Sequence, residues 1–415
     1  MDVKTKGAWL VHHTQKLQQV NGVHEFDNIY AAGKAAILLS ALSASEQTSL
    51  PRKRVELLAK AANINILELP KLLELLEAQS LVEVSKAGVD VLGVTTSKVV
   101  QHATEVYEGL DPSPSENAAL EFSELTSQAP LRQDESKSYL GDRCKLSSGQ
   151  TISLLEQAEQ VGFVDFEDLG GDKVYFNGNL FRREDLAKTQ AVLDSLTPEE
   201  QKQVAEVEDL LKRCGCVSLT GVTKILGVKL FEKLNSISMY DVNVVNNDQE
   251  NVAFVTRPAA FSKYGNPLVE DALDLAKAFV SSLTYGMTRS YHARGRIRMI
   301  EKLMAKLIRG EWVGPVEAIG QDYRALELKG VVEVRPNPLR GYDMRLLKKE
   351  VGQVALEVIK AGDAGDAILN LPGATVTGYV GPEANREGRR RRQAVASKKA
   401  TRDIVMALRT GGGLK

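Results

Sequence analysis

The chain has 415 residues, of which 43% are hydrophobic, so it can form packed cores, and this excludes a wholly disordered protein. Its 53 Lys and Arg almost balance its 54 Asp and Glu, but the charges are unevenly distributed. Residues 285–349 hold 14 basic and 7 acidic residues, and residues 381–415 hold 10 and 3. This asymmetry indicates an anionic partner for the C-terminal third, the alternative being a dipolar surface without a ligand.

The chain has three cysteines, Cys144, Cys214 and Cys216, which are too few to cross-link a multidomain protein by disulfides. Such a count is typical of a reducing compartment, so we expect a cytoplasmic protein. Cys214 and Cys216 form an isolated C-x-C pair with no nearby histidine to complete a zinc site, so we predict no metal. The longest uncharged run near the N-terminus, residues 35–45, is too short to cross a bilayer, and we predict no membrane association.

One local pattern recurs four times: a short apolar helix is followed by two strands that a polar turn joins. The copies cover residues 69–94, 152–176, 228–255 and 319–347. A helix followed by a two-stranded ribbon is the back half of a winged helix-turn-helix, whose helix often enters the DNA major groove. Four copies indicate a tandem array, and arrays commonly bind extended partners.

The first module is predicted over residues 1–107. Apolar residues at helical spacing indicate helices over 31–41 and after Pro51, and Pro70 begins a third helix where its missing N–H is not needed. Two alternating strands follow and complete a winged unit. Residues 108–147 are predicted to be a linker, because they contain a Pro-Ser run and many Ser, Glu and Gln residues, with a short helix around residues 117–125 as an interruption.

The second module is predicted as a partial unit over residues 148–195, in which Gly162 closes a helix and a Gly-Gly pair turns a hairpin. The third module, residues 196–284, starts at Thr197, whose side chain fits a capping box with Glu200. A helix pair over residues 219–226 and 228–234, a hairpin and an amphipathic helix follow.

The fourth module is predicted over residues 285–360. It has helices over 297–308 and 315–319 and a candidate recognition helix over 321–329, which two strands follow. Residues 361–415 combine a Gly/Ala-rich linker with a tail rich in Arg and Lys.

These elements predict an α+β fold, mostly α-helical, made of tandem winged-helix modules that each carry a small antiparallel β-hairpin. The helix–helix–hairpin order, clearest in residues 31–94 and 297–347, resembles the winged-helix superfamily. The resemblance implies either a DNA-binding regulator or an assembly module of a larger complex.

Charge separates the fourth module from the other three. DNA affinity comes largely from Lys and Arg that neutralise phosphates. The candidate recognition helix of the first module sets Glu74 and Glu77 against Lys71, the hairpin of the second is acidic, and the third is mixed. We therefore expect the first three modules to bind a protein partner or to associate with themselves.

In the fourth module, Gln321 and Arg324 are expected to point from the recognition helix toward base edges, with Arg340 at the tip of the wing. The alternative is a solvated basic face. Four consecutive arginines and a Lys-Lys pair in the tail suit a nucleic-acid arm or a helix that docks on an acidic protein. The predicted nucleic-acid-binding residues are Arg289, Arg294, Arg296, Arg298, Gln321, Arg324, Arg340, Arg345, Arg389, Arg390, Arg391, Arg392, Lys398 and Lys399.

No residue pattern typical of an enzyme occurs, so we predict a non-enzymatic protein without catalytic residues or a cofactor. The run Gly33-Lys34-Ala35 lacks the upstream glycine and the Ser or Thr of a phosphate loop. No histidine pair has the spacing of a zinc protease, and no Gly-x-Ser-x-Gly elbow occurs.

The sequence thus predicts a cytoplasmic DNA-binding protein, a transcription regulator or a component of a nucleoprotein complex. Its basic C-terminal third would contact the phosphates of double-stranded DNA. The alternative is a scaffold or adaptor subunit of a larger complex with no direct role in nucleic-acid binding.

Overall fold

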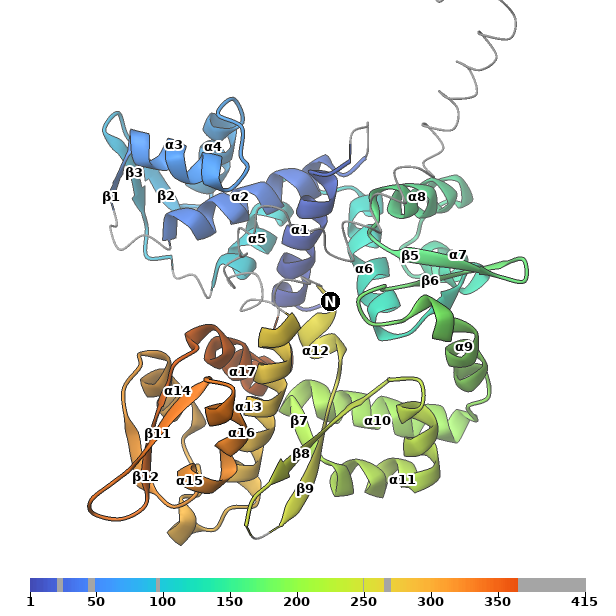
Figure 1. The fold of residues 1–415 in the computed structure, drawn as a ribbon. Coiled ribbons are helices and arrows are strands. Elements are labelled where there is room, and N and C mark those ends of the chain that lie inside the picture. Colours follow the sequence, from blue (N-terminus) through green and yellow to red (C-terminus); the bar gives the residue numbers. More distant parts are fainter. Residues whose placement is uncertain (21–24, 44–48, 95–97, 249, 265–269, 365–415) are drawn as a thin grey trace, which may run out of the picture. The chain divides into compact units, whose positions relative to one another are not determined.

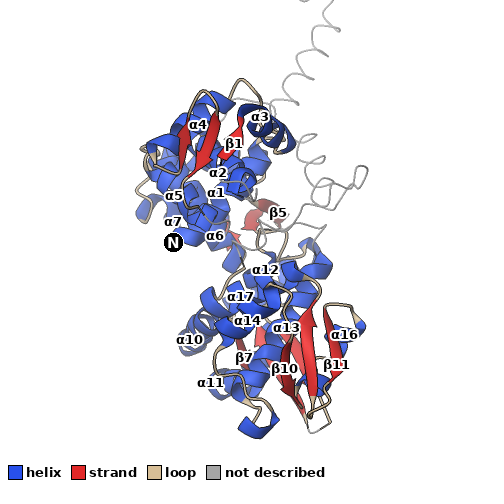
Figure 2. Cartoon of the chain, turned by 90° about the vertical axis from the view of Figure 1, so that its left-hand side faces the viewer, coloured by secondary structure: helices blue, strands red, loops and turns tan. Residues whose placement is uncertain are grey.

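The protein is described by a computed structural model of residues 1–415, apart from residues 21–24, 44–48, 95–97, 249, 265–269 and 365–415 (Figure 1). The chain divides into two compact units, Met1–Gly178 and Asn179–Gly373. Helices make up most of the described chain, and the strands form four small three-stranded antiparallel sheets (Figure 2). The prediction of a mostly α-helical α+β fold is therefore confirmed.

Each sheet is built by the same order of elements: a helix, a short strand, two helices and two strands, with the last strand in the middle of the sheet. In the first sheet these elements are α2 (Asp27–Ser43), β1 (Ser49–Pro51), α3 (Arg52–Ala61), α4 (Leu69–Ala78), β2 (Val82–Val84) and β3 (Gly88–Val91). Gly88 is required at the start of β3, because a Cβ atom there would lie 2.0 Å from the carbonyl oxygen of Leu50.

The second sheet begins inside the segment that was predicted to be a linker, residues 108–147. Its elements are α6 (Pro114–Gln128), β4 (Leu131–Arg132), α7 (Gln133–Asp142), α8 (Ser148–Val161), β5 (Asp165–Leu169) and β6 (Asp172–Phe176). The Pro-Ser run that suggested a linker is in fact a helix start. Ser113 and Glu116 form a capping box around Pro114. Phe122, fully buried on α6, anchors this helix in the core.

Helices α1 (Val3–Leu17) and α5 (Val99–Glu108) pack against α2 in the first compact unit. The fully buried indole of Trp9 on α1 donates a hydrogen bond to Glu124 on α6 at 2.8 Å. His13 stacks on Phe163 with ring centroids 3.8 Å apart, and its Nε2 lies 2.9 Å from the Ser123 hydroxyl. These contacts fix α1 between the first two sheets of the unit.

Burial lowers the pKa of His13 from 6.5 to about 3, and the charge of Lys16 acts in the same direction. The folded state therefore binds fewer protons than the unfolded state below pH 6.5. We predict that His13 lowers the free energy of unfolding by up to about 1.4 kcal/mol per pH unit as the pH falls below 6.5.

The measurement is urea denaturation of the parent and of His13→Phe between pH 7.5 and pH 4.5. Phenylalanine keeps the ring stack and cannot be protonated, so its profile should fall less steeply than that of the parent. The exposed His292→Phe variant is the control and should follow the parent. Parallel profiles for the parent and His13→Phe would contradict the prediction.

The second unit starts with the turn η2 (Arg183–Asp185) and α9 (Leu186–Asp194). The third sheet and its helices then comprise α10 (Pro198–Cys214), β7 (Cys216–Ser218), α11 (Leu219–Asn235), β8 (Asp241–Asn246) and β9 (Asn251–Thr256). The predicted capping box is confirmed, since the Thr197 N–H donates to Glu200 at 2.8 Å and the Glu200 N–H donates back to the Thr197 hydroxyl. Gly227, with φ 73° and ψ 161°, breaks α11 into the two predicted helices.

The fourth sheet follows α12 (Ala259–Ser262), α13 (Glu270–Thr288) and the turn η4 (His292–Arg294). Its elements are α14 (Ile300–Ile308), β10 (Val313–Val316), α15 (Ile319–Asp322), α16 (Arg324–Leu328), β11 (Val332–Pro336) and β12 (Tyr342–Leu346), and α17 (Lys349–Ala361) closes the described chain.

Two predictions for this module were wrong. The helix expected over residues 315–319 is instead the end of strand β10, a turn and the first residue of α15. Val313 and Val316 pair with β12, and Pro315 sits at the irregularity between them. The single recognition helix expected over residues 321–329 is instead two short helices, interrupted at Tyr323, whose side chain is buried in the core.

One hydrophobic core continues across the third and fourth modules. It includes Phe254 of β9, Phe279 and Leu283 of α13, Met344 of β12 and Val354 of α17. Helix α13 packs against both β8 and α17. The two modules of this unit therefore share apolar side chains across residue 285, where the sequence had suggested a boundary. Among the described residues, no helix is long and apolar enough to span a membrane.

Candidate nucleic-acid interface

Arg294, a predicted nucleic-acid contact, is fully buried and bound within the protein. Its guanidinium makes a two-pronged ion pair with Asp322 of α15, with Nη1 2.7 Å from Oδ2 and Nη2 also bonded to Oδ1. Hydrogen bonding to Asp322 raises the pKa of Arg294, so it stays charged. The inward guanidinium is therefore not available to a ligand at the surface.

Gln321 faces the same buried arginine. Its side-chain oxygen accepts a hydrogen bond from Arg294 Nη2 at 2.9 Å. Asn247, at the turn of the β8–β9 hairpin, donates to Asp322 Oδ1 at 2.9 Å. This network holds α15 against the hairpin of the third module, and the expected outward direction of Gln321 was wrong.

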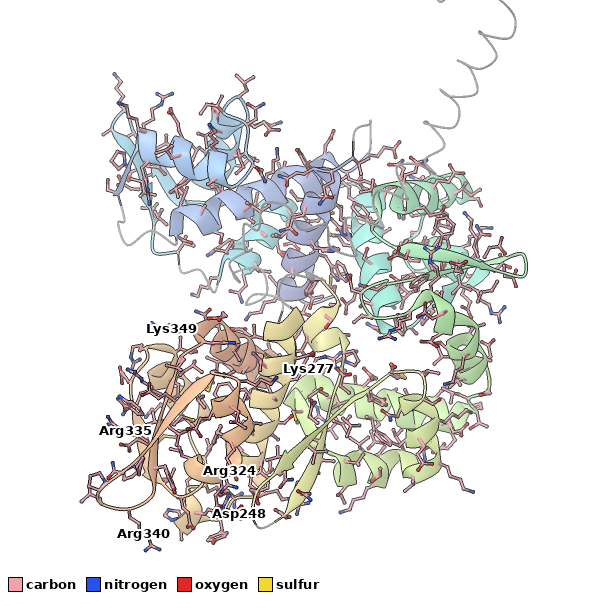
Figure 3. All side chains as sticks on the ribbon, viewed as in Figure 1. Asp248, Lys277, Arg324, Arg335, Arg340 and Lys349 are labelled. Atoms are coloured by element: carbon pink, nitrogen blue, oxygen red, sulfur yellow. The ribbon has the colours of Figure 1, made fainter. Side chains whose placement is uncertain are left out.

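Arg324 is also engaged by that hairpin. Its two terminal nitrogens lie 2.9 and 3.0 Å from the carboxylate of Asp248, which approaches it in Figure 3. The hydrogen bonds to Asp248 raise the pKa of Arg324. Both side chains are 54% exposed, so solvent screens the pair and Arg324 can exchange Asp248 for another anion.

The wing formed by β11 and β12 carries three arginines in different environments. Arg345 pairs with Glu333 at 2.6 Å, and Arg335 lies with its guanidinium carbon 3.8 Å from the ring centroid of Trp312. Arg340 is exposed near the tip of the wing (Figure 3). Of these three, only Arg340 lacks a carboxylate partner among the described residues.

A pocket of about 620 Å³ opens beside α14. Four exposed cations line it: Arg296 and Arg298, which precede α14, and Lys302 and Lys306 on the helix. The two lysines are four residues apart and so lie on one helical face. We call these four residues the basic rim.

No carboxylate of the described chain forms an ion pair with the basic rim, although the charge of Lys306 acts on the nearby carboxylate of Glu311. Arg296 donates to the carbonyl oxygen of Met287, and no ion pair forms at Arg298, Lys302 or Lys306 in the part of the chain that the structure describes. The one carboxylate that lines the pocket, Asp322, is already paired with Arg294. The site is therefore cationic and suited to an anion.

Below the rim, the pocket is apolar. Its other lining residues are Gly286, His292, Gly295, Ile297, Met299, Leu303, Trp312, Val313, Gly314, Val316, Ala318, Ile319, Tyr323 and Met344. Met299 is 61% exposed at this site, so an apolar side chain lies in water beside the cations.

The structure thus brings Arg296 and Arg298 together with two lysines that were not among the predicted contacts. The i, i+4 spacing of Lys302 and Lys306 was the sequence signal that could have added them. Arg289 is exposed after the end of α13. Arg389, Arg390, Arg391, Arg392, Lys398 and Lys399 lie outside the described residues.

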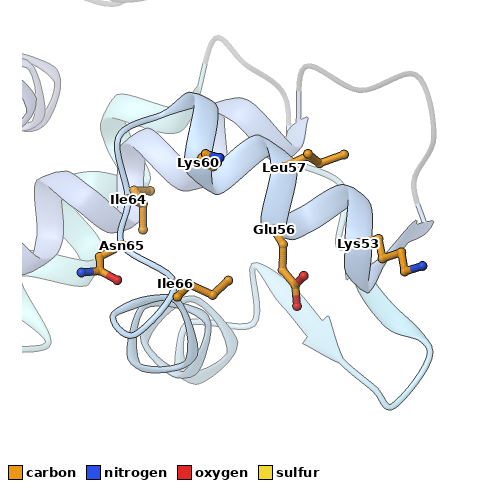
Figure 4. Close-up of a pocket in the computed structure, with 7 residues that line it drawn as sticks. All are labelled: Lys53, Glu56, Leu57, Lys60, Ile64, Asn65 and Ile66. Atoms are coloured by element: carbon orange, nitrogen blue, oxygen red, sulfur yellow. The ribbon is translucent and has the colours of Figure 1, made fainter.

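The first module also has a pocket of about 620 Å³, formed by α3 and the segment that follows it (Figure 4). Leu57 and Ile66 line it and are 61% and 53% exposed. Lys53 and Lys60 share this site with Glu56, so its charge is mixed and does not select an anion. Within the described residues, no group of His, Cys, Asp and Glu is arranged to hold a metal ion.

Comparison with protein-family models and with curated proteins finds no match to the chain. Any functional assignment therefore depends on the residues and geometry given above.

We predict that Arg294→Met lowers the free energy of unfolding of the second unit by about 3–5 kcal/mol, because it leaves Asp322 charged and buried without its partner. Chemical denaturation followed by tryptophan fluorescence at Trp312 would measure the loss. Arg340→Met, which changes an exposed arginine of the same module, is the control and should alter the stability by less than about 0.5 kcal/mol. Equal stabilities for the two variants would contradict the structural role of the pair.

Proposed function

We propose that the protein is a non-enzymatic DNA-binding protein that contacts phosphates through the basic rim and through Arg340. The observation that carries the proposal is the set of four exposed cations around one pocket, none of which forms an ion pair within the described chain. Phosphate contacts of this kind release counterions and supply most of the affinity of sequence-independent binding.

The order of elements around each sheet supports a tandem winged-helix architecture. A helix, a strand, two helices and a two-stranded ribbon, with the last strand central, is the arrangement expected of that superfamily. Winged helices often read bases with the helix before the ribbon. In this chain α16 follows Gln321 and carries Arg324, both of which have partners within the protein.

The proposed mode of binding is therefore phosphate contact without base reading by the α15–α16 region. Arg296, Arg298, Lys302 and Lys306 would follow one strand of the duplex, and the Arg340 wing would contact a second segment. The arginine and lysine tail over residues 389–399 would add further phosphate contacts. A transcription regulator or a component of a nucleoprotein complex, working in the cytoplasm, would use such a surface.

A scaffold role remains the second candidate, because two large apolar side chains are almost fully exposed on the fourth module. Leu328 on α16 is 88% exposed and Leu339 in the wing is 87% exposed. Contiguous exposed apolar surface marks protein interaction sites, and these two side chains are where such a surface would be sought. Size-exclusion chromatography in high salt, with and without nuclease treatment, distinguishes the two functions. A protein complex whose elution is unchanged by nuclease would favour the scaffold role.

We predict that replacing Arg296, Arg298 and Lys302 together with alanine weakens duplex binding and reduces the slope of log K against log salt by about 2–3, since each lost phosphate contact removes about 0.9. Gel-shift titrations at several salt concentrations would measure both quantities. Removal of residues 388–415 should weaken binding in the same sense.

The matched control replaces Lys202, Lys224 and Lys229 with alanine. These are three exposed lysines of the third module, so the change in net charge is the same. The control should bind as the parent does. If the two triple variants have the same affinity and salt slope, the proposed surface is wrong.

A further inference from the structure

The pocket beneath the basic rim has apolar walls, and phosphate contacts alone would not involve them. Its walls combine Ile297, Leu303, Val316 and Ile319 with the exposed side chain of Met299. A duplex presents phosphates at its surface and keeps its bases stacked inside. Contact with a duplex would therefore engage the cations and leave these apolar walls in water.

We propose that this pocket binds a single unpaired nucleotide, with its base against the apolar walls and its phosphate on Arg296, Arg298 and Lys302. The inference rests on the proposed DNA-binding function and names the nucleic-acid feature that the same site selects. A strand end, an overhang or a flipped nucleotide supplies an unpaired base next to a phosphate.

The size of the pocket suits one nucleotide. Its volume of about 620 Å³ lies within the range of small-ligand sites, which are mostly apolar with a few well-placed polar groups. The four cations stand on the segment before α14 and on one face of that helix, so they border the apolar walls. A ligand with an apolar ring and an adjoining phosphate matches both parts.

Trp312 supplies an aromatic surface in the lining. The guanidinium carbon of Arg335 lies 3.8 Å from the centroid of its ring, and that of Arg345 lies 5.0 Å from it. Both arginines are paired with carboxylates, Arg335 with Asp343 and Arg345 with Glu333, so they add little net charge and serve to hold the indole in one orientation. An ordered aromatic side chain is favourable for packing against a base.

The charge of the pocket is fixed by the buried pair. Asp322 reaches the lining, but both of its oxygens accept from Arg294, and one also accepts from Asn247. Without Arg294, this carboxylate would repel a phosphate. The pair thus keeps the floor of the pocket neutral while the rim stays cationic.

The test compares two DNAs of one sequence by fluorescence anisotropy: a blunt duplex and a duplex with a single-nucleotide overhang. The parent should bind the overhang duplex about tenfold more tightly than the blunt duplex, the gain expected from packing one base. A second experiment adds a free nucleoside monophosphate as a competitor of the overhang duplex. If millimolar mononucleotide displaces the overhang duplex from the protein, the pocket binds a free nucleotide as well as one that belongs to a strand.

Met299→Glu places a carboxylate at the mouth of the pocket on a side chain that is already 61% exposed. It should remove the preference for the overhang. Leu328→Glu, the same kind of change at an 88% exposed site away from the pocket lining, is the matched control and should keep the preference.

The outcomes separate the inference from the function on which it rests. Equal, salt-dependent binding of blunt and overhang duplexes would leave the DNA-binding proposal standing and overturn the nucleotide site. Equal loss of preference in Met299→Glu and Leu328→Glu would also overturn it. Binding of no DNA in any form would overturn the function and the inference together.

Discussion

The buried ion pair between Arg294 and Asp322 determines which surface of the fourth module is available to bind a ligand. Taking both charges out of water is costly, and the pair is retained only because two direct hydrogen bonds and the amide of Asn247 satisfy the carboxylate. This geometry fixes η4, α15 and the β8–β9 turn relative to one another. The rest of the candidate site is arranged around that fixed point.

One consequence is that an arginine of this module does not necessarily make the surface around it positive. Arg324 and Arg345 contribute to the positive charge of the module, yet each lies beside a carboxylate that cancels most of its field. Arg298 and Lys302 have no such partner in the described chain, so their field extends into solvent. The position of an anion therefore follows the pairing of the arginines and not their number.

Local sequence signals predicted much of the fold because they act over a few residues. The capping box at Thr197, the break at Gly227 and the turn after Gly162 depend on neighbouring backbone groups and were all found where expected. The short strands β1, β4, β7 and β10 were missed, since two to four residues carry no periodicity and are defined only by a partner strand. The short helix expected around residues 117–125 is part of the longer α6, whose start was missed because Pro and Ser mark both loops and helix starts.

The site itself could be predicted only in part, because pairing is a long-range property. Arg294 and Asp322 are 28 residues apart, and Arg324 and Asp248 are 76 apart, so no local pattern distinguishes them from Arg298 or Lys302. The paired arginines differ in position, because the third and fourth modules share one hydrophobic core and this places α15 and α16 beside the neighbouring β8–β9 hairpin. Gln321 and Arg324 of the α15–α16 region are bound to groups within the protein, although α16 itself is largely exposed, whereas no ion pair forms at Arg298 and Lys302 in the described chain. In this chain they border an apolar pocket, and that combination favours a ligand that has both a ring and a phosphate.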